Sequence, residues 1–97
     1  MLPRYLVYGL IDPRSTMIRY VGQSSIGMTR PRKHKRKPIS DTSHCANWIR
    51  SLQRISLEFA IVVLEVCLTK EQLNGAEHWW VIYGRLSGWP LTNMTAG

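Results

Sequence analysis

Blocks of apolar and polar positions near the start of the chain predict two short strands. Residues 5–10 (YLVYGL) and 17–22 (MIRYVG) are rich in β-branched and aromatic residues, which is typical of strands. The polar cluster between them, residues 12–16 (DPRST), is typical of a turn. We therefore expect the two strands to form a hairpin.

The length of this turn sets the expected pairing of the hairpin. If the loop is residues 12–16, Ile11 faces Met17. Counting back along the ladder then places Tyr8 opposite Tyr20. Residues that oppose each other in a hairpin share one face of the sheet, with Cβ atoms roughly 5 Å apart. The sequence therefore predicts two tyrosine rings side by side on one face.

Two helices are expected in the middle of the chain. Thr29 is a candidate N-cap for a short first helix, with Pro31 in its first turn, and this helix must end before Pro38. Ser43 is a candidate N-cap for the second helix. The apolar residues of that helix recur at helical spacing and are Cys45, Trp48, Ile49, Leu52 and Ile55.

A third strand and a long helix complete the expected fold. Residues 57–67 (LEFAIVVLEVC) form an apolar run that favours a central strand covered on both faces. Thr69 is placed to cap a helix over residues 70–86, which Gly88 would end. The apolar stripe of this helix is Leu73, Ala76, Trp80 and Tyr83, with Trp79, Ile82 and Leu86 beside it. The order β-β-α-α-β-α predicts an α+β fold, a small and mainly antiparallel sheet of about three strands flanked by helices.

Length and charge narrow the function classes. The 97 residues indicate one domain, 1–97, and 13 Lys plus Arg against 6 Asp plus Glu give a formal net charge of +7. That charge favours a polyanionic partner, with nucleic acid ahead of an anionic membrane surface. No apolar run approaches the roughly 20 residues of a membrane span, and Pro and Arg come too early for a secretory signal. Cys45 and Cys67 lack metal or disulfide spacing and are interpreted as buried thiols of a cytoplasmic protein.

Six polar residues are candidates for chemistry, although each has an ordinary explanation by itself. Glu77 lies at the edge of the apolar stripe, where a carboxylate is costly unless it is paired or binds a cation. Its ordinary explanation is a rim glutamate that reaches water. The other candidates are Tyr8, Tyr20, Arg30, His34 and Asn93. Alone, the tyrosines would be core aromatics, the arginine and histidine part of a charged surface, and the asparagine a turn residue.

The order and spacing of these residues resemble the catalytic domain of the GIY-YIG nuclease family along essentially the whole chain. LVY at residues 6–8 stands at the position of the family's first motif, and YVG at residues 20–22 at that of the second. The family also has a helical arginine, a histidine four positions on, a metal-binding glutamate followed by aromatics, and a terminal asparagine. The matching residues are Arg30, His34, Glu77 in AEHWWVIYG and Asn93 in NMTAG.

One position departs from the family pattern, and for another a second residue in the sequence could fill the same role. Leu6 replaces the glycine of the first motif, although the tyrosine is kept. Arg32 is a rival to Arg30 for the arginine role, because the proline between them disturbs the local helix. The four-residue spacing to His34 favours Arg30. His44 is the counterpart of a second histidine found in some relatives.

The resemblance implies a metal-dependent endonuclease that hydrolyses DNA phosphodiester bonds by attack of water. Glu77 would hold one divalent cation, Mg²⁺ or Mn²⁺, and Arg30 would donate to the phosphate. Tyr8 and His34 would together accept the proton of the water, and which of the two is the base stays open. Tyr20 would orient the water or bind phosphate, and the terminal asparagine would hold a phosphate oxygen or a partner side chain.

A basic cluster beside these residues would bind DNA through its phosphates without reading its sequence. The DNA-binding candidates are Lys33, Lys35, Arg36, Lys37 and His44. Relatives often carry a separate DNA-binding domain, so the chain is interpreted as a catalytic module, either whole or excised from a longer protein. A nucleic-acid-binding module on the same fold, without turnover, is the alternative function.

Overall fold

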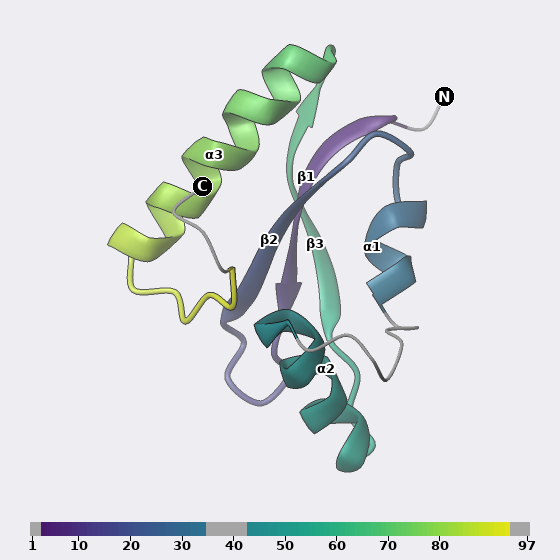
Figure 1. The fold of residues 1–97 in the computed structure, drawn as a ribbon, viewed down its shortest axis with the longest axis vertical. Helices are drawn as coiled ribbons and strands as arrows, with labels where there is room; N and C mark the ends of the chain where they lie inside the picture. The colour runs from purple at the N-terminus through teal and green to yellow at the C-terminus, as the bar shows by residue number, and fades with distance from the viewer. Residues whose placement is uncertain (1–2, 35–42, 94–97) are drawn as a thin grey trace.

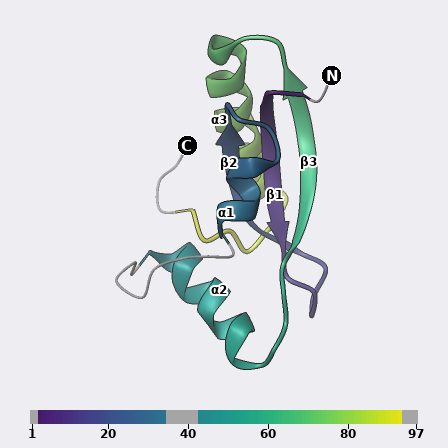
Figure 2. The ribbon, with the colours of Figure 1, turned by 90° about the vertical axis from the view of Figure 1, so that its right-hand side faces the viewer.

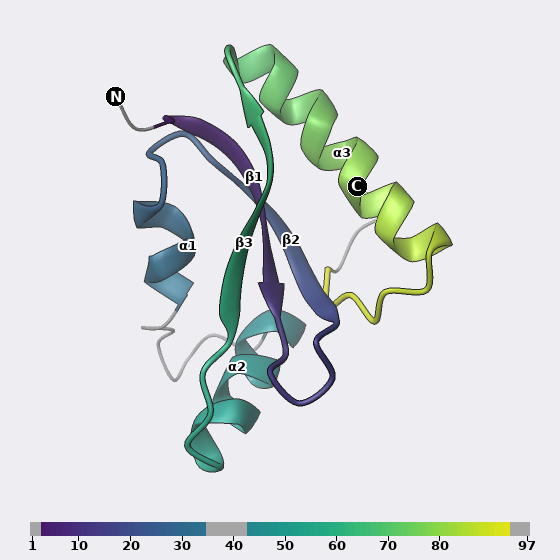
Figure 3. The same ribbon diagram turned by 180° about the vertical axis from the view of Figure 1, so that it is seen from behind.

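The computed structural model of the chain describes residues 3–34 and 43–93 and has an α+β fold (Figure 1). One antiparallel sheet of three strands has the order β2-β1-β3. The elements are β1 (Tyr5–Ile11), β2 (Ile18–Ser24), α1 (Thr29–Lys33), α2 (His44–Arg54), β3 (Ala60–Cys67) and α3 (Lys70–Leu86). Helix α3 lies on one face of the sheet, and α1 and α2 lie on the other (Figures 2 and 3). The fold class and the order of elements are therefore as the sequence predicts.

Strand β1 is the central strand, because its residues are buried on both faces. Leu6 and Leu10 point toward α2 and pack in a core cluster with Trp48, while Val7 points the other way and packs with Leu73 of α3. The sequence-based prediction that residues 57–67 form the central strand is wrong. That prediction depended on a continuous apolar run, which does not by itself distinguish a central from an edge strand.

Strand β3 is an edge strand that is half exposed. Within residues 3–34 and 43–93 it pairs only with β1. Val63 and Val66 remain 43% and 53% exposed, whereas Ile61 near the start of the strand packs against the core cluster of α2. The exposed valines explain why the burial of this strand is lower than its apolar composition suggests.

The hairpin register differs from the predicted one by two positions. Tyr8 pairs with Gly22, and Leu10 pairs with Tyr20. The cause lies at the turn, where the N–H of Asp12 donates to the C=O of Met17, so that β2 begins one residue later. A bulge then adds a second residue to the shift. Because side chains alternate with a period of two, the two tyrosines still share one face as diagonal neighbours.

The caps of the two longer helices are those expected from the sequence. The Ser43 hydroxyl accepts from the N–H of Ala46 at the start of α2, and the Thr69 hydroxyl accepts from the N–H of Gln72 at the start of α3. Gly88 follows α3 with a φ of 83°, a conformation that favours glycine. These local signals were sufficient to place both helices.

Three details of the helices differ from prediction. Thr29 is the first residue of α1 rather than its cap, and the cap position belongs to Met28, which makes no side-chain cap bond. Ile55 follows α2 and is 52% exposed. Tyr83 is also exposed, because the buried side of α3 runs through Leu73, Val81 and Gly84 instead. No helix in the described ranges is long and apolar enough to cross a membrane.

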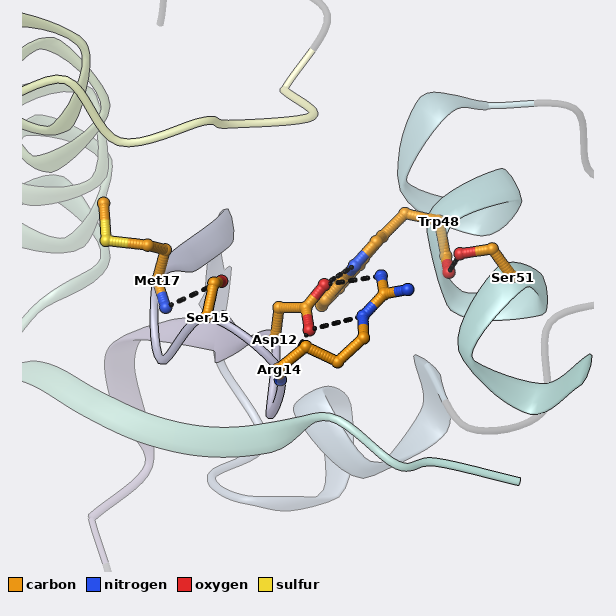
Figure 4. Close-up of polar contacts among 6 residues, drawn as sticks. All are labelled: Asp12, Arg14, Ser15, Met17, Trp48 and Ser51. Atoms are coloured by element: carbon orange, nitrogen blue, oxygen red, sulfur yellow. Dashed lines mark hydrogen bonds and ion pairs between the residues drawn. The ribbon is translucent and has the colours of Figure 1, made fainter. Parts of the chain in front are cut away.

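The turn between β1 and β2 is fastened to α2 by Asp12 (Figure 4). The backbone N–H and the guanidinium of Arg14 donate to this carboxylate at 2.8–3.0 Å, and the indole N–H of Trp48 donates at 3.0 Å. The hydrogen bonds from Arg14 hold the pKa of Asp12 well below its usual range, with Trp48 acting in the same direction. Asp12 is therefore an ionised, buried link between the hairpin and the helix that covers it.

We expect the Asp12→Ala variant to be less stable than the parent protein by about 1–3 kcal/mol at pH 7, because the buried Trp48 N–H loses its acceptor. The folded pKa of Asp12 is depressed, so its contribution is present above the unfolded value of about 4 and is lost as pH falls further. Urea denaturation at pH 7 and pH 3 measures both effects. Ser15→Ala in the same exposed turn is the control and should change stability by less than about 0.5 kcal/mol. An equal pH dependence in Asp12→Ala and the parent protein would contradict this account.

Candidate active site

A cluster of two phenols and one imidazole lies on the sheet face that carries α1 and α2. Tyr8 comes from β1, Tyr20 from β2, and His34 follows the last turn of α1. A hydrogen bond of 2.7 Å joins Tyr8 Oη to His34 Nε2, and both side chains are buried. The ring of Tyr20 meets the imidazole edge-on with centroids 5.2 Å apart. Residues 26 positions apart in the sequence are thus in direct contact.

Gly22 provides the space in which the two tyrosine rings lie. It is the residue paired with Tyr8, and a Cβ added there would come within 2.6 Å of the Tyr8 phenol and 2.8 Å of the Tyr20 ring. Real Cβ contacts essentially never reach such distances, so any larger residue forces the rings apart. The glycine of the YVG motif is therefore explained by packing at this site.

We expect Gly22→Ala to lower the stability of the protein by about 1–3 kcal/mol through overpacking and to displace the Tyr8 ring. Urea denaturation and near-ultraviolet circular dichroism of the aromatic residues measure the two effects. Gly75→Ala is the matched control, because a Cβ at this helical position meets nothing within 4 Å. It should raise stability by about 0.5–1 kcal/mol through helix propensity. Equal effects of the two substitutions would contradict the packing role of Gly22.

Arg30 lies one helical turn before His34 on α1. Its side chain is exposed, and its positive charge is close enough to lower the pKa of both Tyr8 and Tyr20. The rival arginine, Arg32, instead lines an apolar groove together with Arg4 and Val63. The position of the charge therefore favours Arg30 over Arg32 as the arginine of the site.

Both phenols are held in the protonated form in the free protein. Burial raises the pKa of Tyr8 well above its usual value, with the neighbouring Tyr20 adding to the rise and the charge of Arg30 opposing it. Burial also raises the pKa of Tyr20 to about 12, and Cys45 and Glu77 act in the same direction. At neutral pH neither tyrosine is a preformed phenolate, so a proton leaving Tyr8 needs an acceptor. The imidazole of His34 is in place to be that acceptor.

Glu77 reaches the site from the other face of the sheet. It lies on α3, and its Oε1 accepts a hydrogen bond of 3.1 Å from the side-chain amide of Gln23 on β2. Its negative charge raises the pKa of Tyr20, which places the carboxylate within electrostatic reach of the phenol cluster. The phenols and the carboxylate are thus on opposite faces of β2, an outer strand of the sheet.

Asn93 is bound to the outer edge of β2. Its Nδ2 donates to the C=O of Val21 at 2.8 Å, and its Oδ1 accepts from the N–H of Val21 at 3.0 Å. Thr92 also bonds the C=O of Arg19, so the segment that follows α3 returns to lie along β2 (Figures 1 and 3). These contacts support a structural role in which Asn93 closes the edge of the strand that carries Tyr20.

The predicted DNA-binding residues are only partly within the described chain. Lys33 is exposed at the end of α1, and His44 is exposed at the start of α2. Lys35, Arg36 and Lys37 lie outside the described residues. Lys33 and His44 therefore both lie on helices that cover the sheet face with the two tyrosines.

Glu77 is the candidate metal ligand, and its surroundings suit a cation. In residues 3–34 and 43–93, no group of three His, Cys, Asp or Glu side chains is placed to hold a metal ion. Within these ranges no Lys or Arg forms an ion pair with Glu77 either. An ionised carboxylate has about four lone-pair sites, and the bond from Gln23 uses one of them. The residues therefore fit Mg²⁺ held by one carboxylate, with water and substrate phosphate as the other ligands.

No protein-family model, curated protein or solved structure matches the chain. The resemblance to GIY-YIG nucleases therefore depends on the motif residues and on how the fold arranges them. Sequence reasoning missed the roles of Gly22 and Gln23, which lie two and three residues after Tyr20 on the same strand. The signal for Gln23 was strand alternation, which turns it away from the tyrosines and toward the helix that carries Glu77.

Proposed function

We propose that this domain is a metal-dependent endonuclease that hydrolyses DNA phosphodiester bonds, with a site of the GIY-YIG type. The observation that supports it most is the 2.7 Å hydrogen bond between Tyr8 and His34, inside a cluster that also includes Tyr20 and the charge of Arg30. A phenol linked to a buried imidazole beside an arginine combines a proton acceptor with a phosphate-binding group. The sequence motifs predict this combination, and the contact supports it.

The proton path of the proposed reaction starts at the attacking water. The water oxygen attacks phosphorus and passes its proton to Tyr8 Oη, while the proton of Tyr8 passes to Nε2 of His34. The bond between phosphorus and the leaving oxygen breaks, and the leaving oxygen takes a proton from solvent. His34 ends as an imidazolium and then releases its proton to solvent, which replaces the proton taken by the leaving oxygen, so charge and protons balance. In this scheme Tyr8 relays the proton and His34 is its final acceptor. A relay suits Tyr8 because burial raises the pKa of its phenol, so that it does not remain as a phenolate.

Charge on the phosphate would be stabilised from both sides of β2. Arg30 would donate its planar set of N–H groups to the phosphoryl oxygens. A divalent cation bound at Glu77 would supply Lewis-acid stabilisation of the leaving oxygen. The scissile phosphate would then lie beside β2, between the phenol cluster and the carboxylate. Tyr20 would orient the water, and Asn93 would keep the strand edge in position.

The partner in this proposal is DNA, bound through its phosphates by the exposed basic residues of α1 and α2. A separate DNA-binding domain would supply sequence specificity, because phosphate contacts do not read bases. The two cysteines are free thiols in the structure, which suits the reducing cytoplasm where we place the protein.

Conversion of supercoiled plasmid to the nicked form tests the proposal. We expect nicking by the purified domain when Mg²⁺ or Mn²⁺ is present, and none with EDTA. Binding of DNA without metal-dependent nicking would reject the enzyme and select the alternative, a nucleic-acid-binding module on the same fold. A gel-shift assay on the same samples measures the binding.

A further inference from the structure

Gln23 connects Glu77 to a lysine of the same helix. Its amide nitrogen donates to Oε1 of Glu77 at 3.1 Å, and its amide oxygen accepts from Nζ of Lys70 at 3.1 Å. Lys70 and Glu77 are seven positions apart on α3, which is about two helical turns or roughly 10 Å along the axis. The two charged side chains therefore lie on one side of the helix, and the Gln23 amide lies between them.

We propose that Gln23 is a positioning residue that holds the Glu77 carboxylate ready for a divalent cation and keeps Lys70 from neutralising it. The inference rests on the proposed function, since it concerns the same candidate metal ligand. Gln23 itself touches neither the metal nor the phosphate in this proposal. It acts through Glu77, as hydrogen-bonded partners of metal-ligating carboxylates commonly do.

Glutamine suits this position because its amide has a donor and an acceptor on one short side chain. The donor orients the carboxylate without cancelling its charge, whereas an ion pair would compete with the cation for the same oxygens. The acceptor occupies the ammonium group of Lys70. Unbonded lysine and glutamate side chains populate many rotamers, so without Gln23 the ammonium group of Lys70 would be free to turn toward the Glu77 carboxylate.

The test compares Mn²⁺ binding by variants that differ only in these contacts. Mn²⁺ is paramagnetic and broadens the NMR signals of nearby backbone amides, so a titration followed at Glu77 and its neighbours measures binding without any cleavage. Gln23→Met keeps the length of the side chain but removes the donor and the acceptor. We expect about tenfold more Mn²⁺ to be needed for half-broadening in this variant than in the parent protein.

A second substitution separates the two parts of the proposal. Lys70→Met in the Gln23→Met background removes the ammonium group that would pair with Glu77, and it should restore part of the lost affinity. Gln72→Met on the same helix is the matched control, because the side-chain oxygen of Gln72 accepts from the backbone N–H of Leu68, and its loss should leave binding unchanged. Urea denaturation of each variant verifies that the fold is retained.

The outcomes distinguish this inference from the proposed function. If Mn²⁺ broadens the Glu77 region equally in the parent protein and in Gln23→Met, Gln23 is not a positioning residue, whereas the metal site stands. If the Lys70→Met substitution restores nothing, the part assigned to Lys70 is wrong. If the parent protein shows no broadening near Glu77, the proposed metal-dependent function fails together with the inference.

Discussion

Glu77→Gln is expected to reduce metal-dependent nicking by about 1,000-fold, which corresponds to roughly 4 kcal/mol of transition-state stabilisation. The substitution keeps the shape of the side chain and leaves an amide oxygen that can still accept from Gln23. It removes the negative charge that a divalent cation needs. DNA binding measured by gel shift should be retained, because the phosphate contacts proposed for α1 and α2 do not involve this carboxylate.

Glu71→Gln is the matched control for Glu77→Gln. Glu71 is an exposed carboxylate in the first turn of the same helix. Its substitution should leave the nicking rate unchanged. A Glu77→Gln variant that nicks as fast as the parent protein would remove the metal from the proposal and leave the phenol cluster without its proposed cofactor.

Tyr8→Phe is expected to lower the single-turnover nicking rate by about 100- to 1,000-fold, the range of one general acid–base contribution. The ring stays in the core, where Tyr8 is 1% exposed, and only the hydroxyl that bonds His34 is lost. His34→Ala should cost a similar factor, because the same proton then has no acceptor. The exposed phenol of Tyr83 on α3 offers the control Tyr83→Phe, which should be neutral.

The double variant of Tyr8 and His34 tests whether they act as one relay. Two members of a single proton path are not additive, so the double variant should be scarcely slower than either single variant. Multiplied losses would mean that the two side chains have independent roles. An unchanged rate in Tyr8→Phe would exclude Tyr8 from the proton path and would leave the imidazole to take the proton from water directly.

In the hairpin, the sequence placed the turn correctly but not the pairing of the two strands. The turn residues indicated where the strands reverse, and an assumed loop placed Tyr8 opposite Tyr20. The bond from Asp12 to Met17 and the bulge after it moved the pairing by two positions, so that Gly22 is the residue opposite Tyr8. The prediction that the rings share a face remained correct because an even shift keeps side chains on the same face. Only the register explains why the YVG motif needs its glycine.

In the candidate site, residue spacing predicted the neighbours on one helix but not the contacts between distant segments. The spacing of Arg30 and His34 on a short helix was enough to expect them on one side of it, and the contact between His34 and Tyr8 agrees with the predicted pair. Nothing in the spacing indicated that Glu77 would approach from the opposite face of the sheet. The Gln23 contact was also hidden, since it joins residues 54 positions apart.

What the sequence by itself determined was local: the two capped helices, the strands, the turn and the set of polar residues worth testing. Caps, periodicity and turn chemistry act over a few residues, so they can be read directly along the chain. The tertiary structure alone decided that β1 is central, that β3 is an edge, and that Glu77 and the tyrosines lie on opposite faces of β2. Those outcomes depend on which apolar faces are covered, and burial is a property of the packed molecule rather than of any short segment.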